Sequence, residues 1–199
     1  MSEQTLRKTY HHGNLRAQLL NQSAEIIAKQ GIESLSIRQV AKQLGVSHNA
    51  PSRHFENKAE LVQNLVLDIM SRQQSRLRSV LESNKGRHQQ AQLRAALWSY
   101  LDWCASHPIE AQVIHHPDVR KMADHRIRSS MGDWVKSVEA LLGYDRKPGD
   151  PVSGAALHFF SLALGGAAIL LNPLLRSASE EPDTKILIQR LVDDAYPVS

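Results

Sequence analysis

The chain has 199 residues and a net charge of +4, with 42% hydrophobic and 22% charged residues. A chain of this length can bury a hydrophobic core without disulfides or metal ions, and it suits one or two domains. The composition excludes collagen-like, disulfide-rich and wholly disordered chains. The single cysteine, Cys104, cannot form an internal disulfide, which fits a reducing compartment.

Two segments bear on targeting and membrane insertion. Residues 1–16 are polar and lack the apolar core of a signal peptide. Residues 154–175 are long and apolar enough to cross a membrane, but they contain His158, Ser161 and a Gly-Gly pair and have no aromatic or basic flanks. We expect this segment to be a buried helix or a subunit interface, and the protein to be cytoplasmic with no membrane partner.

The excess positive charge lies in the first third of the chain. Residues 1–60 contain eight Lys or Arg and five Asp or Glu, whereas residues 61–199 contain 16 and 15. Such a bias points to a polyanionic partner, although a solvated basic surface has the same composition.

Helical spacing of apolar residues extends along the whole chain, and no segment shows the alternation typical of a strand. Gly31 and Gly45 favour helix C-termini. Ser36 followed by Gln39 forms a capping box, and Asn57 caps a long helix. The predicted fold class is all-α with about nine helices. Their expected positions are 14–30, 36–44, 47–55, 58–83, 89–106, 108–115, 118–142, 152–171 and 183–195.

Residues 36–55 contain the most informative pattern in the chain. Two short helices joined by a turn at Gly45 form a helix-turn-helix, because glycine accepts the positive φ that the turn needs. The second helix of such a unit enters the DNA major groove with its N-terminal residues at the base edges. The turn alone is also compatible with an αα-hairpin in an all-helical core.

A longer pattern resembles the N-terminal DNA-binding domain of the TetR/AcrR repressor family. The caps, the turn and the His-Phe…Lys segment in GVSHNAPSRHFENKAEL, residues 45–61, have the spacing of that family. The likeness extends over about residues 14–65, and YHHGNLR, residues 10–16, is similar to one branch of the family. The resemblance implies a three-helix DNA-binding domain in residues 1–57 and a larger helical dimerisation and ligand-binding domain in residues 58–199.

The resemblance also implies which residues face DNA. In the second helix these are Ser36 or Arg38, and further along they are Ser47, His48, Asn49, Ser52, Arg53, His54 and Lys58. Asn49 suits bidentate contact with adenine, and Arg53 and Lys58 can hold phosphates. A basic arm, residues 1–13 with Arg7 and Lys8, can reach a phosphate or the minor groove, or remain a solvated tail.

Two positions depart from the family pattern. Where the family usually has Leu-Tyr before Arg-His-Phe, this chain has Pro51 and Ser52. The tyrosine commonly holds a phosphate, and the serine can do so only at shorter reach. Proline has no N–H and disfavours helical geometry in the preceding residue. Asn49 is therefore the expected cap, and the third helix is expected to be short.

The C-terminal part contains no motif of comparable strength. The family resemblance implies that it dimerises and often encloses a small-molecule pocket. Twofold pairing is also favoured physically, because a single helix-turn-helix buries too little surface for high affinity. The expected homodimer interface is formed by residues about 152–171, which are apolar nearly all round, together with residues 183–195. An ordinary core helix is the alternative.

Aromatic residues at helical spacing are the candidate lining of an effector pocket. Such a pocket would take a largely apolar small molecule, whereas the same residues can simply form core. The candidates are Trp98, Trp103, Trp134, Phe159 and Phe160.

Two clusters have potential ligands or nucleophiles without a matching motif. The spacing of His115, His116 and Asp118 fits no closed metal site, and we expect a solvated turn there. Cys104 and His107 have the spacing of a nucleophile and a base, but no orienting third group accompanies them. No phosphate-binding loop or dinucleotide fingerprint occurs. We therefore expect no enzyme activity, no metal and no cofactor.

The expected function is that of a homodimeric transcription regulator. Its helix-turn-helix would bind a palindromic operator in double-stranded DNA as a repressor, and a small-molecule effector would release it. Such an effector must bind one spacing of the two DNA-binding domains better than the other. Two alternatives stay open: a DNA-binding regulator without a small ligand, and a helical protein whose hairpin has lost DNA binding because of Pro51 and Ser52.

Overall fold

The computed structural model describes residues 15–197, which form ten α-helices and two short 3₁₀ turns and contain no strand. The predicted all-α fold class is therefore confirmed. The basic arm with Arg7 and Lys8, and Asn14, the first residue of the helix expected over 14–30, lie outside the described residues. The chain divides into two compact units between Leu65 and Val66, and each unit is described by itself.

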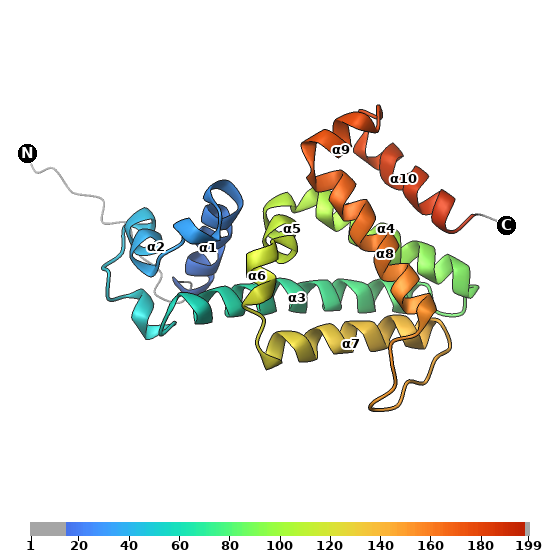
Figure 1. The fold of residues 1–199 in the computed structure, drawn as a ribbon, viewed down its shortest axis with the longest axis horizontal. Coiled ribbons are helices and arrows are strands. Elements are labelled where there is room, and N and C mark those ends of the chain that lie inside the picture. Colours follow the sequence, from blue (N-terminus) through green and yellow to red (C-terminus); the bar gives the residue numbers. More distant parts are fainter. Residues whose placement is uncertain (1–14, 198–199) are drawn as a thin grey trace, which may run out of the picture. The chain divides into compact units, whose positions relative to one another are not determined.

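The N-terminal unit consists of short elements around one apolar core. Helix α1 contacts both η2 and α2. Leu19, Ile26, Val40 and Phe55 are almost fully buried between these elements. The elements, visible in Figure 1, are α1 (Leu15–Gln30), η2 (Ile32–Ser34), α2 (Ile37–Leu44), η3 (Pro51–Arg53) and the start of α3 (Lys58–Ser83).

The predicted caps of this unit are present. The Ser36 hydroxyl accepts a hydrogen bond from the Gln39 backbone N–H at 3.1 Å and begins α2. Gly45 ends α2 with φ 66°, a left-handed conformation that side chains disfavour. Asn57 Oδ1 accepts from the Glu60 backbone N–H at 3.0 Å and begins α3. These local signals place both helices where the sequence predicts them.

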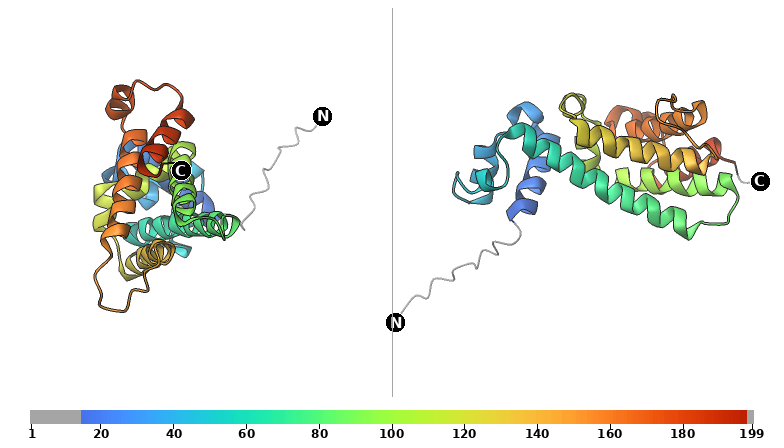
Figure 2. Two further views of the ribbon diagram at one scale, coloured as in Figure 1. Left: turned by 90° about the vertical axis from the view of Figure 1, so that its right-hand side faces the viewer. Right: turned by 90° about the horizontal axis from the view of Figure 1, so that it is seen from below.

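The C-terminal unit is built around α4. This helix contacts α5, α7, α8 and α10, and its Leu97, Leu101 and Cys104 are fully buried. Figures 1 and 2 show α7 beside α3, where Gln74 donates to the Ser130 carbonyl at 2.8 Å. With the remainder of α3, the elements are α4 (Gln89–Ser106), α5 (Pro108–His115), α6 (Pro117–Lys121), α7 (His125–Leu141), α8 (Gly154–Leu171), α9 (Pro173–Ala178) and α10 (Thr184–Ala195).

Helices α4 and α8 approach closely at Gly166. A Cβ atom added there would lie 2.7 Å from Cδ2 of Leu101 in α4. Ala163 and Ala167 on the same side of α8 are fully buried. These small residues of α8 therefore serve the intrachain core, while other residues of the helix remain on the surface.

A buried carboxylate holds the loop between α7 and α8. Glu139 accepts hydrogen bonds from the Ser153 backbone N–H at 3.0 Å and from Arg146 Nε at 2.6 Å. These contacts, led by the backbone bond, lower the pKa of the Glu139 carboxyl below its usual value. The ionised carboxylate thus stabilises this connection at neutral pH.

Two differences from the expected helices have local causes. The expected helix over 118–142 is divided into α6 and α7, because Asp124 accepts from the Ile127 backbone N–H at 3.0 Å and caps a new helix. Helix α9 lies between residues 171 and 183, where no helix was predicted. Asn172 Oδ1 accepts from the Leu174 backbone N–H at 2.9 Å and starts this extra turn.

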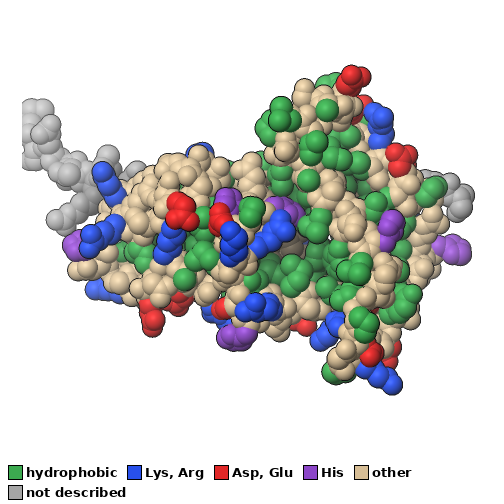
Figure 3. Space-filling view, viewed as in Figure 1, with side chains coloured by type: hydrophobic (Ala, Val, Ile, Leu, Met, Phe, Trp, Pro, Cys, Tyr) green, Lys and Arg blue, Asp and Glu red, His purple; other side chains and the backbone are tan. Residues whose placement is uncertain are grey.

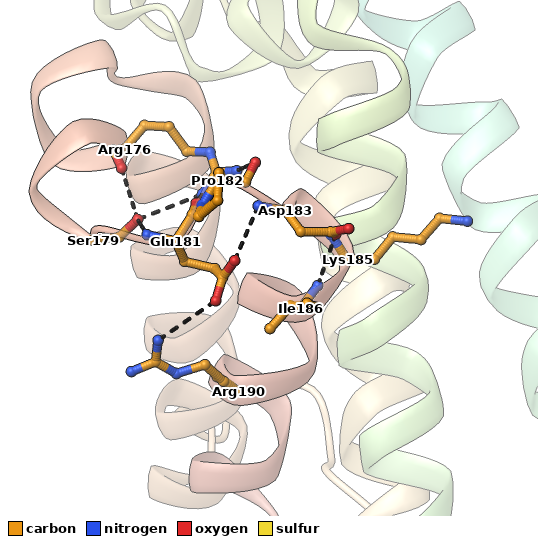
Figure 4. Close-up of polar contacts among 8 residues, drawn as sticks. All are labelled: Arg176, Ser179, Glu181, Pro182, Asp183, Lys185, Ile186 and Arg190. Atoms are coloured by element: carbon orange, nitrogen blue, oxygen red, sulfur yellow. Dashed lines mark hydrogen bonds and ion pairs between the residues drawn. The ribbon is translucent and has the colours of Figure 1, made fainter.

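The connection from α9 to α10 is organised by one arginine (Figure 4). The Arg176 guanidinium donates to the backbone carbonyls of Glu181 and Pro182, the latter at 2.9 Å. It also donates to the Thr184 hydroxyl at 3.1 Å. Asp183 then caps α10 by accepting from the Lys185 backbone N–H at 2.7 Å. These contacts fix the chain between two helices that carry exposed apolar residues.

Candidate nucleic-acid interface and ligand cavity

The turn after α2 has the geometry of a helix-turn-helix. The backbone N–H of Val46 donates to the Ala41 carbonyl at 3.1 Å, and that of Gly45 donates to the Lys42 carbonyl at 3.2 Å. These bonds satisfy carbonyls at the end of α2 and turn the chain toward residues 47–55.

Residues 47–55 do not form the predicted helix. They form a single 3₁₀ turn, η3, flanked by other turns. Pro51 has no N–H to donate, and the Ser52 hydroxyl donates to the Asn49 carbonyl at 2.8 Å, where a helix would place a backbone N–H. Ala50, and not the predicted Asn49, is the N-cap residue, with no side-chain cap.

The residues expected to face DNA lie on the N-terminal unit. His54 and Lys58 are partly buried, while Ser36, Arg38, Ser47, His48, Asn49, Ser52 and Arg53 are exposed. Four of the set, Ser47, Asn49, Arg53 and His54, line one open hollow together with Leu15, Gly45, Val46 and Ala50. The structure thus brings these four together, and the other five lie outside the hollow.

The basic side chains of this set are available for an external anion. Among the described residues, Arg38, Arg53 and Lys58 make no side-chain hydrogen bond or ion pair. Two other basic residues of the unit are engaged: Lys29 pairs with Glu25, and Arg16 donates to Asn64 Oδ1 at 2.8 Å. Unpaired surface cations of this kind are what phosphate contacts require.

The C-terminal unit contains a cavity of about 310 Å³ enclosed by α3 to α8. Most of its wall is apolar, with Met70 from α3, Ile127 from α7 and Leu164 from α8. Of the five predicted aromatic residues, only Trp134 lines it. Phe160 lies against Trp134, with ring centroids 5.0 Å apart, and Trp98, Trp103 and Phe159 are elsewhere in the unit.

The cavity wall also contains a neutral hydrogen-bonded pair that was not predicted from the sequence. The Tyr100 hydroxyl and His115 Nε2 lie 2.8 Å apart. Burial, aided by the charge of Arg120, lowers the pKa of His115 to about 4, and burial raises the pKa of Tyr100 well above its usual value. The expected solvated turn is therefore wrong for His115. No sequence motif marks it, since its partner comes from another helix.

Neither of the other reactive clusters forms a site. Cys104 is fully buried, and burial raises the pKa of its thiol to about 12, which disfavours the thiolate. His107 lies instead against the Trp103 ring, 6.0 Å between centroids. His116 Nδ1 accepts from the Asp118 backbone N–H and caps α6. Within residues 15–197, no group of three His, Cys, Asp or Glu side chains is placed to hold a metal ion.

Helix α8 has two unlike faces. It is the one helix of the described chain that is long and apolar enough to cross a membrane, with mean hydropathy 1.8 and 28% of its residues buried. Leu157 and Leu164 are 54% and 45% exposed, and Leu174 of α9 and Ile186 of α10 are also exposed. The single chain therefore leaves a row of large apolar residues uncovered on α8, α9 and α10.

Comparisons with known proteins agree with this geometry. The sequence matches the family described as bacterial regulatory proteins, tetR family, over residues 19–65. None of the curated proteins matches it.

Three solved structures illustrate the likeness in fold. The fatty acid degradation regulator FadR from Bacillus halodurans has a TM-score of 0.69 and 16% identity, covering 91% of this chain and 94% of that one. FadR from Bacillus subtilis in complex with stearoyl-CoA has a TM-score of 0.68 and 15% identity, and the match covers 91% of this chain and 97% of that one. AibR in complex with isovaleryl coenzyme A and operator DNA has a TM-score of 0.72 and 16% identity, and the match covers 92% of this chain and 99% of that one.

Proposed function

This chain belongs to the TetR family of DNA-binding transcriptional regulators, and on that premise we propose that it is a ligand-responsive repressor. It binds a palindromic operator as a homodimer in the cytoplasm. Residues 1–57 are its DNA-binding domain and residues 58–199 its dimerisation and ligand-binding domain. The helix-turn-helix at Gly45, with exposed polar residues and unpaired cations beside it, is the observation that carries the proposal.

DNA contacts are divided between two kinds of side chain. Exposed Asn49, beside Ser47 and His48, reads base edges in the major groove. Arg53 and Lys58 hold phosphates, since neither has a partner among the described residues. The 3₁₀ turn makes the reading segment short, so a few residues carry the base contacts.

The separation of these roles is tested with two variants. Lys58→Ala is expected to weaken binding to all duplexes alike and to lower the slope of log affinity against log salt by about 1. Asn49→Ala is expected to cost about 1–3 kcal/mol on the operator and almost nothing on random DNA. Fluorescence anisotropy on both duplexes at several salt concentrations measures both effects.

Lys29→Ala is the matched control, because Lys29 is already paired with Glu25. It should leave affinity and salt slope unchanged. Equal losses on operator and random DNA for both Lys58→Ala and Asn49→Ala would contradict the division of roles.

The homodimer is proposed to form through residues 152–171 and 183–195. The support is the exposed apolar row on α8, α9 and α10, which water would otherwise contact. A twofold pair of DNA-binding domains also matches the symmetry of a palindromic operator.

Leu157→Asp is expected to raise the dimer dissociation constant at least about 100-fold, because an unpaired carboxylate in an apolar interface costs several kcal/mol. Sedimentation equilibrium measures the change. Tyr144→Asp is the control, since Tyr144 is 51% exposed, close to the 54% of Leu157, but lies outside the proposed interface. A Leu157→Asp protein that dimerises like the control would exclude α8 from the interface.

The cavity of the C-terminal unit is the proposed effector site. Its apolar wall and few polar groups are typical of small-molecule pockets. Two proteins with the same fold are in complex with stearoyl-CoA and with isovaleryl coenzyme A, which supports a small-molecule effector for a protein of this fold. The effector releases DNA by binding the form of the dimer whose DNA-binding domains do not match the operator.

A further inference from the structure

The charge of the cavity wall is entirely positive. It contains Arg120 from α6 and Arg128 from α7, and no Asp or Glu. Both arginines are exposed, so they lie where the cavity opens to solvent. The Arg128 guanidinium has no hydrogen bond or ion pair with any described residue, and Arg120 makes one bond, to the His115 carbonyl at 2.8 Å. Most of their N–H donors remain free for a ligand.

The interior of the cavity offers no place for a charge. Tyr100 and His115 hydrogen-bond each other, and His115 is neutral at pH 7 because of its lowered pKa. Gln74 is engaged with Ser130. The remaining wall is dominated by apolar side chains. At about 30 Å³ for a water-sized group, a cavity of about 310 Å³ holds roughly ten non-hydrogen atoms.

Apolar side chains also surround the opening. Met131 lines the cavity and is 46% exposed, so a ligand that fills the opening would cover it. Figure 3 shows hydrophobic side chains in a hollow on this face, with Lys and Arg side chains at its border. A second hollow shares Arg120 and Leu164 and continues to Leu174 at the start of α9.

We infer that the effector of this protein is an anionic amphiphile. Its apolar body, of roughly ten non-hydrogen atoms, fills the cavity between α3 and α7, and its carboxylate or phosphate pairs with Arg128 and Arg120 at the opening. A larger anionic carrier group extends past Arg120 into the second hollow. This inference rests on the proposed effector site and specifies its ligand.

The test compares head groups on one alkyl chain. Binding of decanoate, 1-decanol, decyltrimethylammonium and decanoyl-coenzyme A to the full-length protein is measured by titration calorimetry without DNA. Quenching or enhancement of tryptophan fluorescence gives a second readout, because Trp134 lines the cavity. Decanoate or its coenzyme A ester is expected to bind at least tenfold more tightly than decanol, and the cation not at all.

Arg128→Ala is the decisive variant, since Arg128 is exposed and its loss breaks no contact within the described residues. It is expected to weaken binding of the anionic probe about tenfold and to leave decanol binding unchanged. Arg78→Ala is the matched control: Arg78 is an exposed arginine on α3 that does not line the cavity. Binding of the anionic probe should also weaken as salt is added.

The outcomes separate the possible ligands and the two proposals. Tighter binding of decanoate assigns the anion to a carboxylate, whereas binding of the coenzyme A ester alone assigns it to the carrier phosphates. Decanol binding as tight as that of the tighter-binding anionic probe, no effect of Arg128→Ala, or no binding of any probe would overturn the inference. If the protein binds the anionic probe but stays bound to operator DNA, only the proposal that the effector releases DNA would be contradicted.

Discussion

Replacing Phe55 by Ala is expected to destabilise the N-terminal unit by about 3–5 kcal/mol and to abolish DNA binding. Phe55 is 1% exposed and one of the largest fully buried side chains of the protein. It lies just beyond His54, the C-cap of the turn η3, and its backbone N–H donates to the Pro51 carbonyl at 3.0 Å. The Arg16 guanidinium lies 5.5 Å from its ring centroid. The ring therefore anchors the segment that carries the proposed base contacts.

Unfolding in guanidinium chloride, followed by circular dichroism, measures the loss of stability. Fluorescence anisotropy on duplex DNA measures the loss of DNA binding. Phe55→Leu is the control, because it keeps an apolar side chain in the same space and should cost no more than about 1–2 kcal/mol. A Phe55→Ala protein with unchanged stability and full DNA affinity would show that this anchor does not hold the segment.

Acidification from pH 7.5 to pH 5 is expected to cost about 2 kcal/mol of stability through His115 alone. The pKa of His115 is lowered from its ordinary 6.5 to about 4, so the unfolded chain binds a proton between these values while the folded chain does not. The stability linked to this residue is complete above pH 6.5 and is lost as the pH falls toward 4. Burial beside Arg120 is the cause.

His115→Gln removes the titration and keeps a polar side chain beside Tyr100. The free energy of unfolding of this variant should depend less on pH between 7.5 and 5 than that of the parent. His88→Gln, at an exposed histidine without a side-chain cap contact, should behave like the parent. Parallel pH profiles for the parent and His115→Gln would contradict the buried, neutral state of His115.

Features determined by nearby residues could be predicted from the sequence. The helix ends at Ser36, Gly45 and Asn57 depend on contacts within a few residues, and all three are found in the structure. The helical spacing of apolar residues predicted the all-α fold class, because this spacing is also a property of residues that are close in the sequence. The break at Asp124 was also a local signal, but the apolar spacing continued across it and favoured one helix over two.

Features that depend on several helices could not be predicted. The cavity forms where α3 to α8 converge, so its lining comes from residues far apart in the chain. Aromatic spacing predicted five lining residues alike and could not separate Trp134, which the structure places at the cavity, from Trp103, which is buried against Tyr100. The pair of Tyr100 and His115 and the free guanidinium of Arg128 have no sequence signal of their own.

The recognition segment shows a third case, in which two local signals competed. The resemblance to other helix-turn-helix domains predicted a helix over residues 47–55, while Pro51 and Ser52 opposed it. This segment forms a 3₁₀ turn, because Pro51 has no backbone N–H to donate and the Ser52 hydroxyl donates a hydrogen bond to the Asn49 carbonyl. The exposed side chains remain beside the turn, but the element that presents them is shorter than expected.

Selection of random genomic DNA fragments by the purified protein at near-physiological salt tests whether this helix-turn-helix recognises a specific DNA sequence. Recovery of one palindromic sequence, lost in Asn49→Ala and kept in Lys29→Ala, is the expected result. It would show that the short recognition segment reads bases and that the protein is a sequence-specific regulator. Recovery of no sequence above background would contradict that account and show that Pro51 and Ser52 have removed specific DNA recognition from this helix-turn-helix.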